Sequence, residues 1–241
     1  MKIKILTLFP NMIEAFKNES IIKRAIDKGL VTIDVIDMRQ YSTDKHHHVD
    51  DTPCGGGAGM VLRVDVVDSA IKANRNNNSK VIMMTPQGIK YDQKIANLLA
   101  KEEEIVIVCG HYEGFDERIR KYVDLELSIG DFVLTGGEIA SMAISDSIIR
   151  LLDNVITKES YLDDSFSNGL LEYPQYTRPV SYDSMDVPSV LLSGNHKDIN
   201  RYRLKESLRR TYLRRKDLLD NYELNEEEKK LLKEIMEEEK C

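Results

Sequence analysis

Two adjacent carboxylates and three loops marked by glycine or proline are the residues of this chain best suited to chemistry. Asp163 and Asp164 follow one another in a polar stretch between two patterned regions. A carboxylate acts as a general base when burial or its neighbours tune its pKa. Asp before a helix is also a common N-cap, and spacing alone favours the cap here.

The three loops have the residue types of a ligand site. Residues 128–138 place one glycine and then a glycine pair around a short apolar run, and residues 110–118 carry two glycines. The third loop, Thr85-Pro86-Gln87-Gly88, also follows an apolar run. Glycine lets a backbone approach a ligand closely. If these loops meet at one edge of a sheet, they form one pocket.

Two further motifs are weak by themselves. The glycine-rich run 54–60 lacks the Gly-Lys-Ser/Thr of a P-loop and the spacing of a dinucleotide fingerprint. A flexible loop and a contact with phosphate or RNA backbone are equally compatible with it. His46-His47-His48 favours a polar loop over a metal site, because adjacent side chains on an extended chain point to opposite faces.

Short apolar strands and amphipathic helices would position these loops. Apolar runs at 2–9, 31–36, 80–84 and 104–109 predict strands, and 122–129 is a further apolar segment. Helical spacing covers 12–28, 64–74, 92–100 and 138–152. Buried strands separated by helices predict a parallel sheet covered on both faces. Ligands bind outside the carboxyl ends of such strands, where the three loops lie.

The pattern changes after residue 152. Residues 153–169 are polar, and 190–236 predict helices. We therefore expect an α/β domain at 1–156, a linker at 157–164 and a small helical domain at 165–241. The stretch 196–216 carries nine Lys/Arg against two acids, whereas 223–240 has eight Glu and four Lys. The alternatives are a solvated helix followed by an acidic one, or a surface that contacts phosphates.

Composition excludes several protein classes. Hydrophobic residues make up 41% and charged residues 31% of 241, as in globular proteins. No apolar run approaches the ~20 residues that cross a membrane, and the start predicts a strand instead of a signal peptide. Three widely spaced cysteines, Cys54, Cys109 and Cys241, indicate neither a disulfide framework nor a zinc site, which favours a reduced cytoplasm. The net charge of -7 argues against nucleic-acid binding only if charge is evenly spread.

Taken together, the motifs resemble the bacterial tRNA (guanine-N1)-methyltransferase family, TrmD, over nearly the whole chain. The resemblance is carried by Leu8-Phe9-Pro10, Val49-Asp50-Asp51 with 55–60, 110–118, 128–138, Asp164-Ser165-Phe166, 169–171, 176–179, Val187-Pro188 and 191–196. It implies the SPOUT fold, in which a parallel α/β sheet carries a deep trefoil knot. It also implies a homodimer with an active site built from both chains.

The resemblance implies S-adenosylmethionine as the cofactor. The cofactor-contacting positions of the family fall on Thr85, Pro86, Gly110, Tyr112, Glu113, Ile129, Gly130, Leu134, Gly136 and Gly137. The knot would need small residues where its loops cross, which would account for the glycines.

The implied reaction is methylation of N1 of guanosine 37 of tRNA, beside the anticodon. N1 carries a proton, so a base must remove it, and the charge that shifts to O6 needs a cation. The family pattern assigns the base to Asp164, against the cap favoured by spacing, and the O6 or phosphate partner to Arg150. It also implies magnesium near Glu113, Asp164 and Glu172, where Glu172 stands in place of an Asp common in the pattern.

The basic stretch then fits an RNA-binding domain that contacts the anticodon stem-loop. The predicted contacts are Arg201, Arg203, Arg209, Arg210, Arg214 and Arg215. The polar linker is expected to order on tRNA binding and to carry Asp164 into place.

Three other functions compete with this one. A knotted methyltransferase with another RNA target would keep the cofactor loops but not need Asp164 and Arg150. A non-catalytic RNA-binding dimer would keep the basic stretch and need no cofactor loop. Without the resemblance, the residues predict a nucleotide-binding α/β protein with a helical interaction domain.

Overall fold

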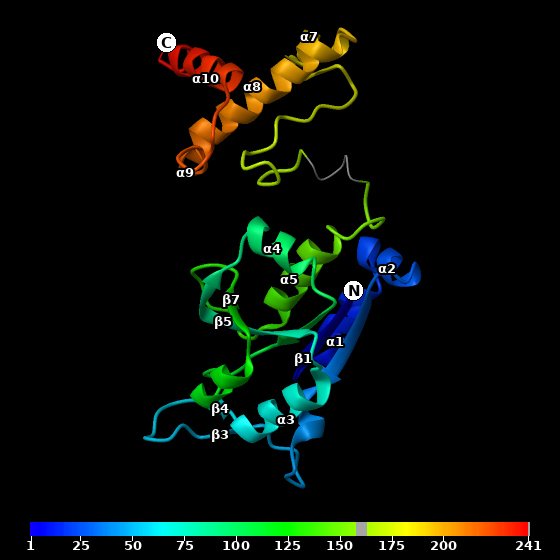
Figure 1. Ribbon diagram of the computed structural model, residues 1–241, viewed down its shortest axis with the longest axis vertical. Helices are drawn as coiled ribbons and strands as arrows, with labels where there is room; N and C mark the ends of the chain where they lie inside the picture. Colours follow the sequence, from blue (N-terminus) through cyan, green and yellow to red (C-terminus); the bar gives the residue numbers. More distant parts are fainter. Residues whose placement is uncertain (158–162, 241) are drawn as a thin grey trace. The chain divides into compact units, whose positions relative to one another are not determined.

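A computed structural model describes residues 1–157 and 163–240, and the chain separates into two compact units, Met1–Thr157 and Lys158–Cys241 (Figure 1). We call them the first and second units. Most of the predicted linker, 157–164, and Cys241 lie outside the described residues. Among the described residues, no helix is long and apolar enough to span a bilayer.

The first unit is built on a parallel five-stranded sheet in the order β2-β1-β6-β5-β7. Its strands are β1 (Lys2–Thr7), β2 (Thr32–Asp37), β5 (Ser79–Lys90), β6 (Glu104–Val108) and β7 (Leu125–Ser128). The expected parallel sheet is confirmed, and the apolar segment 122–129 supplies its fifth strand. All five residues of β6 are buried, which explains its continuous apolar run.

Helices cover both faces of this sheet. One face packs against α1 (Pro10–Lys17), α2 (Ser20–Asp27), α4 (Gln93–Leu99) and α5 (Glu138–Ile149). The other packs against α3 (Val64–Asn74) and the short helices η1 (Met38–Tyr41) and η2 (Glu117–Tyr122). Side chains alternate between the two cores: Ile105 and Ile107 belong to one, and Val106 and Val108 to the other.

Local residues explain where these helices begin and end, and where one expectation is wrong. The predicted single helix at 12–28 is two helices, because Ser20 adopts a φ of 55° that a right-handed helix interior excludes. Pro10 begins α1 at a position where its missing N–H costs nothing. Gly29, at φ 68°, ends α2 as expected, and its N–H donates to the Ile26 carbonyl.

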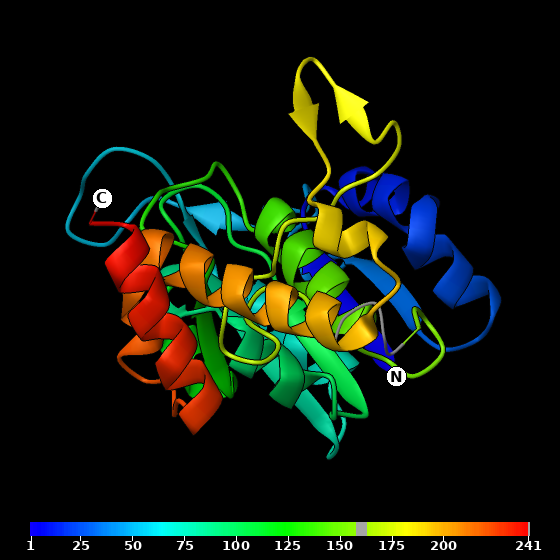
Figure 2. The same ribbon diagram turned by 90° about the horizontal axis from the view of Figure 1, so that it is seen from above.

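The second unit holds mostly helices. These are α7 (Ser189–Leu192), α8 (His196–Arg214), α9 (Lys216–Leu219) and α10 (Glu226–Glu238), and α8 and α10 lie side by side (Figure 2). Leu208 of α8 and Leu231 and Ile235 of α10 form a small core with Leu170. Asn225 and Glu228 form a capping box that begins α10. The hairpin of β8 (Ser181–Tyr182) and β9 (Met185–Asp186) was not expected from the sequence.

Candidate functional site

A cavity of about 340 Å³ lies at the carboxyl ends of β6 and β7, beside the middle of β5. Three segments line most of it, namely 83–87, 110–117 and 127–137. All ten residues predicted to contact a cofactor are among its lining residues: Thr85, Pro86, Gly110, Tyr112, Glu113, Ile129, Gly130, Leu134, Gly136 and Gly137. The structure therefore brings the three predicted loops together at one site, and their contact with a cofactor stays a prediction.

The first segment differs from its expected form. Residues 85–88 do not follow a finished strand, because β5 continues to Lys90. They bulge out of it instead: Met84 and Ile89 both pair with Leu127. A Cβ on Gly88 would lie 2.5 Å from the Leu127 backbone nitrogen, so only glycine allows the strand to return to β7.

The second segment is held by the glycine-rich loop. The backbone N–H of Glu113 donates to the Met60 carbonyl at 2.9 Å, next to the short hairpin of β3 (Asp50–Asp51) and β4 (Val61–Leu62). A Cβ on Gly59 would lie 2.4 Å from Oε1 of Glu113. The run 54–60, weak as a sequence motif, thus packs against one wall of the cavity.

The third segment closes over a buried polar network. Nε2 of His111 lies 2.7 Å from Oε2 of Glu138, and the Thr7 hydroxyl donates to Oε1 at 2.5 Å. Glu138 is only 1% exposed. Its carboxylate therefore ties the end of β1 to the 110–114 loop and to the start of α5.

The glycine pair leaves room for this network. A Cβ on Gly136 would lie 2.2 Å from Cε1 of His111, and one on Gly137 would lie 2.8 Å from the Cα of Cys109. The Gly137 N–H donates to the Gly110 carbonyl at 2.9 Å. Two cavity walls therefore meet at van der Waals distance with no side chain between them.

His111 and Glu138 are site residues that sequence reasoning did not single out. Each lies inside a motif that was recognised, but nothing in local spacing pairs residues 27 positions apart. An acidic residue in the first turn of a helix is normally an exposed partner for the helix dipole, which conceals its buried role here. Burial and the Glu138 charge also raise the pKa of the Cys109 thiol, so that thiol stays neutral.

The predicted catalytic pair lies on different units. Arg150 is the half-buried C-cap residue of α5 in the first unit. Asp164 lies in a turn of the second unit, where its carbonyl accepts a hydrogen bond from the Ser167 N–H at 3.1 Å. The helix cap that spacing favoured for Asp164 is wrong, because a turn instead of a helix follows it, with Phe166 at φ 76°.

The predicted magnesium ligands are also divided between the units. Glu113 lines the cavity of the first unit, whereas Glu172 of the second accepts a hydrogen bond from the Gln175 amide at 2.7 Å. Within the part of the chain that the structure describes, no three His, Cys, Asp or Glu side chains are grouped to hold a metal. His48 pairs with Asp44 at 2.5 Å, as a polar loop would.

The six predicted RNA-contacting arginines have different surroundings. Arg201 and Arg209 of α8 form ion pairs with α10, and Arg215 pairs with Asp217 at 2.8 Å. The Arg203 guanidinium lies 4.9 Å from the centre of the Tyr173 ring. Arg214 is exposed and Arg210 half-buried.

A parallel α/β sheet with a glycine-walled cavity beside its strand ends is the arrangement in which α/β proteins bind small ligands. The family model described as tRNA (Guanine-1)-methyltransferase TrmD matches residues 1–221. The chain therefore belongs to the TrmD family.

Curated relatives extend this match over the full chain. A tRNA (guanine-N(1)-)-methyltransferase of Fusobacterium nucleatum is 60% identical over 240 residues, which cover 99% of this chain and 100% of the relative. Proteins of the same name from Anoxybacillus flavithermus and Malacoplasma penetrans are 55% and 53% identical, covering 95% and 92% of this chain and 96% and 98% of theirs.

Proposed function

We propose that this protein transfers a methyl group from S-adenosylmethionine to N1 of guanosine 37 of tRNA. The observation that carries the proposal is the glycine-walled cavity of a TrmD-family chain, because all ten expected cofactor positions line it. The proposed substrate lies beside the anticodon, so the modification would help to maintain the reading frame. A tRNA substrate also makes the cytoplasm the expected compartment of the protein.

The cavity fits such a cofactor in size and in the character of its walls. Its 340 Å³ falls within the range of roughly 300–1,000 Å³ for small-molecule sites. The Thr85 hydroxyl and the Glu113 carboxylate supply polar groups, and Ile129 and Leu134 supply apolar surface. When bound, S-adenosylmethionine supplies the methyl group.

The proposal includes the deep trefoil knot of the SPOUT fold. Two close backbone contacts are compatible with it, since Gly88 approaches β7 and Gly137 approaches Cys109 with no space for a Cβ. Glycine allows such close approach of two backbone segments, which the loops of a knot also need.

The protein's own residues supply the proton transfer and the charge stabilisation. In the proposed mechanism the Asp164 carboxylate accepts the N1 proton of guanine. The Arg150 guanidinium stabilises the charge that develops on O6, or holds a neighbouring phosphate, because its planar fork combines charge and fixed geometry.

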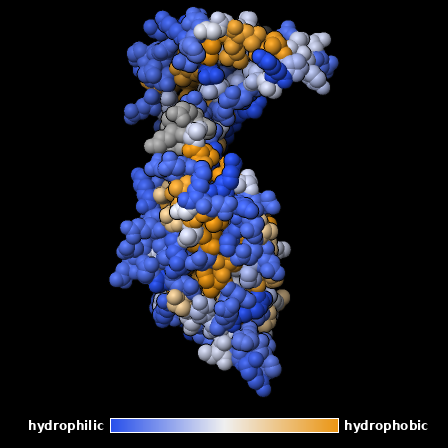
Figure 3. All heavy atoms as spheres, turned by 90° about the vertical axis from the view of Figure 1, so that its right-hand side faces the viewer, coloured by the Kyte–Doolittle hydropathy of each residue, from blue (hydrophilic) through white to orange (hydrophobic). Residues whose placement is uncertain are grey.

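A second copy of the chain completes the proposed active site. Phe132 and Val133 are 54% and 82% exposed on a loop that also lines the cavity, and Ile139 of α5 is 50% exposed. Apolar residues gather on the surface of the first unit that Figure 3 shows. A homodimer that covers Phe132, Val133 and Ile139 would remove apolar surface from water and close the site.

Magnesium is a further part of the proposal. Carboxylate oxygens such as those of Glu113, Asp164 and Glu172 are ligands that magnesium prefers. No step above depends on it, and loss of methyl transfer in EDTA with recovery on adding magnesium would support it.

The second unit binds the anticodon stem-loop through the basic α8. Loop bases of RNA are the natural targets, and the guanine leaves its stack at a cost of roughly a few kcal/mol. Phosphate contacts fix the register of the RNA without reading its sequence.

The test is transfer of labelled methyl to an unmodified tRNA with guanosine at positions 36 and 37. We expect product at N1 of position 37, and a loss of at least about a hundredfold in Asp164→Ala. Asp163→Ala is the matched control, because it removes the exposed neighbouring carboxylate and should keep activity. Cofactor binding without transfer to this tRNA would point to another RNA target.

A further inference from the structure

Three cations on one face of α8 are paired with α10. Arg201, Lys205 and Arg209 recur every four residues and therefore share a face. The nearest distances to α10 are 3.3 Å from Arg201 to Glu234 and 2.8 Å from Lys205 to Glu238.

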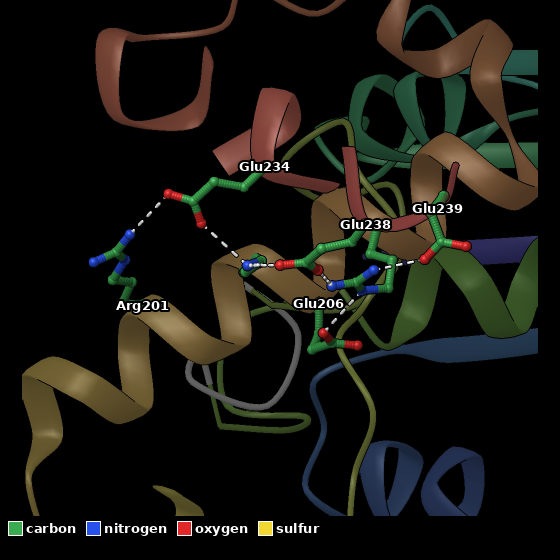
Figure 4. Close-up of polar contacts among 7 residues, drawn as sticks. Arg201, Glu206, Glu234, Glu238 and Glu239 are labelled. Carbon is green, nitrogen blue, oxygen red and sulfur yellow. Dashed lines mark hydrogen bonds and ion pairs between the residues drawn. The ribbon is translucent and has the colours of Figure 1, made fainter. Parts of the chain in front are cut away.

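Arg209 is the most highly connected of these cations. It lies 2.6 Å from Glu239 and 3.1 Å from Glu206, and it also contacts Glu238 (Figure 4). The side chain is only 21% exposed. Glu238 and its neighbours raise the pKa of Arg209, so this cation is held by protein carboxylates. We call Arg201, Lys205 and Arg209 the paired face.

A second set of arginines points away from α10. Arg203, Arg210 and Arg214 are separated by seven and four residues, so they also share a face, roughly 160° around the helix from the paired face. Within residues 1–157 and 163–240, neither Arg210 nor Arg214 forms an ion pair. We call Arg203, Arg210 and Arg214 the open face.

The open face has the chemistry of a nucleic-acid surface. Its arginines span about 16 Å along the helix, enough to follow several phosphates of one strand. The Arg203 guanidinium stacks over Tyr173, and Tyr176 nearby in sequence is 47% exposed. Arginines beside aromatic rings suit a backbone contact with adjacent unstacked bases.

We propose that α10 divides the basic helix α8 into two functions. The α10 carboxylates neutralise the paired face, which then holds the second unit together, and the open face contacts the RNA phosphates. This inference rests on the proposed function, since it needs tRNA as the ligand. It reduces the six predicted RNA-contacting arginines to three, with Arg201, Arg209 and Arg215 serving protein contacts.

The first experiment compares one cation from each face. Binding of a fluorescent unmodified tRNA to the full-length protein with S-adenosylmethionine is measured between 50 and 200 mM KCl. Arg210→Gln should reduce the slope of log K against log salt by about 1. Lys205→Gln, which removes one cation of the paired face, should leave the slope unchanged and lower the melting temperature.

The second experiment looks for a gain of binding. Glu234→Gln with Glu238→Gln releases Arg201 and Lys205, whereas Arg209 keeps Glu206 and Glu239. The salt slope should therefore rise by up to about 2, and RNA of unrelated sequence should bind more tightly. Glu226→Gln with Glu227→Gln changes the net charge equally, but Glu226 pairs with Lys229 instead of α8, so this control should behave like the wild type.

The outcomes separate this inference from the proposed function. If the wild type neither binds nor methylates tRNA, the proposed function fails and the inference fails with it. If the wild type does both, yet Lys205→Gln lowers the slope as much as Arg210→Gln, only the division of α8 is overturned. The division of α8 is also overturned if the double variant at Glu234 and Glu238 and the double variant at Glu226 and Glu227 give the same salt slope. For Arg210→Gln we expect a higher KM for tRNA with an unchanged kcat, which a fold defect would not produce.

Discussion

The two units build their candidate sites from different parts of the chain. In the first unit the cavity walls meet through backbone, and Gly136 and Gly137 leave no space for a Cβ. In the second unit the candidate surface lies on the regular helix α8, and long charged side chains form it. The first site is therefore set by packing distances, whereas the second is set by which charges remain unpaired.

This difference decides what each site is sensitive to. Buried contacts such as the one between His111 and Glu138 are hardly screened by salt. Exposed pairs such as Arg201 with Glu234 are screened, and each contributes little to stability by itself. Mutations in the first unit should thus alter stability and cofactor binding, and charge changes in the second should alter RNA binding.

The largest effect is expected at the buried carboxylate. Glu138→Ala leaves the Thr7 hydroxyl and the His111 ring without their shared partner, at about 1–3 kcal/mol for each group. Since His111 then loses its link to α5, cofactor affinity should fall as well. Thermal unfolding and calorimetric titration with S-adenosylmethionine measure the two effects.

Glu238→Ala is the matched change in the second unit. It removes a carboxylate with two cationic partners, but one that is exposed, so its effect on unfolding should be smaller and cofactor affinity should be unchanged. Equal destabilisation by the two variants would contradict the contrast between buried and exposed networks.

A smaller effect is expected from a single methyl group at the cavity. Gly137 has an ordinary φ of -83°, so Gly137→Ala is limited by space alone, against the Cys109 backbone at 2.8 Å. Overpacking costs about 1–3 kcal/mol of stability, which thermal unfolding measures. Because the shifted backbone belongs to the cavity wall, affinity for S-adenosylmethionine should also fall in a calorimetric titration.

Gly194→Ala provides the opposite case in the second unit. Gly194 has a φ of 71° and no atom within 4 Å of an added Cβ, so the substitution adds backbone strain of about 1–2 kcal/mol without a clash. Cofactor affinity should not change. A loss of affinity in this variant would show that the two units do not respond independently.

The sequence predicted the cavity better than it predicted the charged surface, for a physical reason. Glycine marks positions where the local backbone has no room for a side chain, so the loops containing Gly110, Gly130 and Gly137 could be found from the sequence. The bulge at 85–88 was missed because it depends on register with β7. The break at Ser20 was missed because the apolar spacing continues across it.

The division of α8 could not be predicted from the sequence. A charge count treats Arg209 and Arg210 alike, although they are neighbours on different faces of the helix. Their difference arises from Glu238 and Glu239, about 30 residues away, which α10 brings alongside. Partners that distant in sequence are fixed by tertiary packing instead of local spacing.

The smallest effect is expected from the pH dependence of the paired face in the second unit. Lys205 and Arg209 lower the pKa of Glu238 to about 2, from an ordinary value of 4.5. A lowered folded-state pKa means that the ion pairs stabilise the unit fully above pH 4.5 and lose this effect as pH falls towards 2. Amide hydrogen exchange of α10 should therefore accelerate across this range. Glu238→Gln has no carboxylate to titrate there and should flatten the profile, so an unchanged profile would assign the acid sensitivity to other carboxylates.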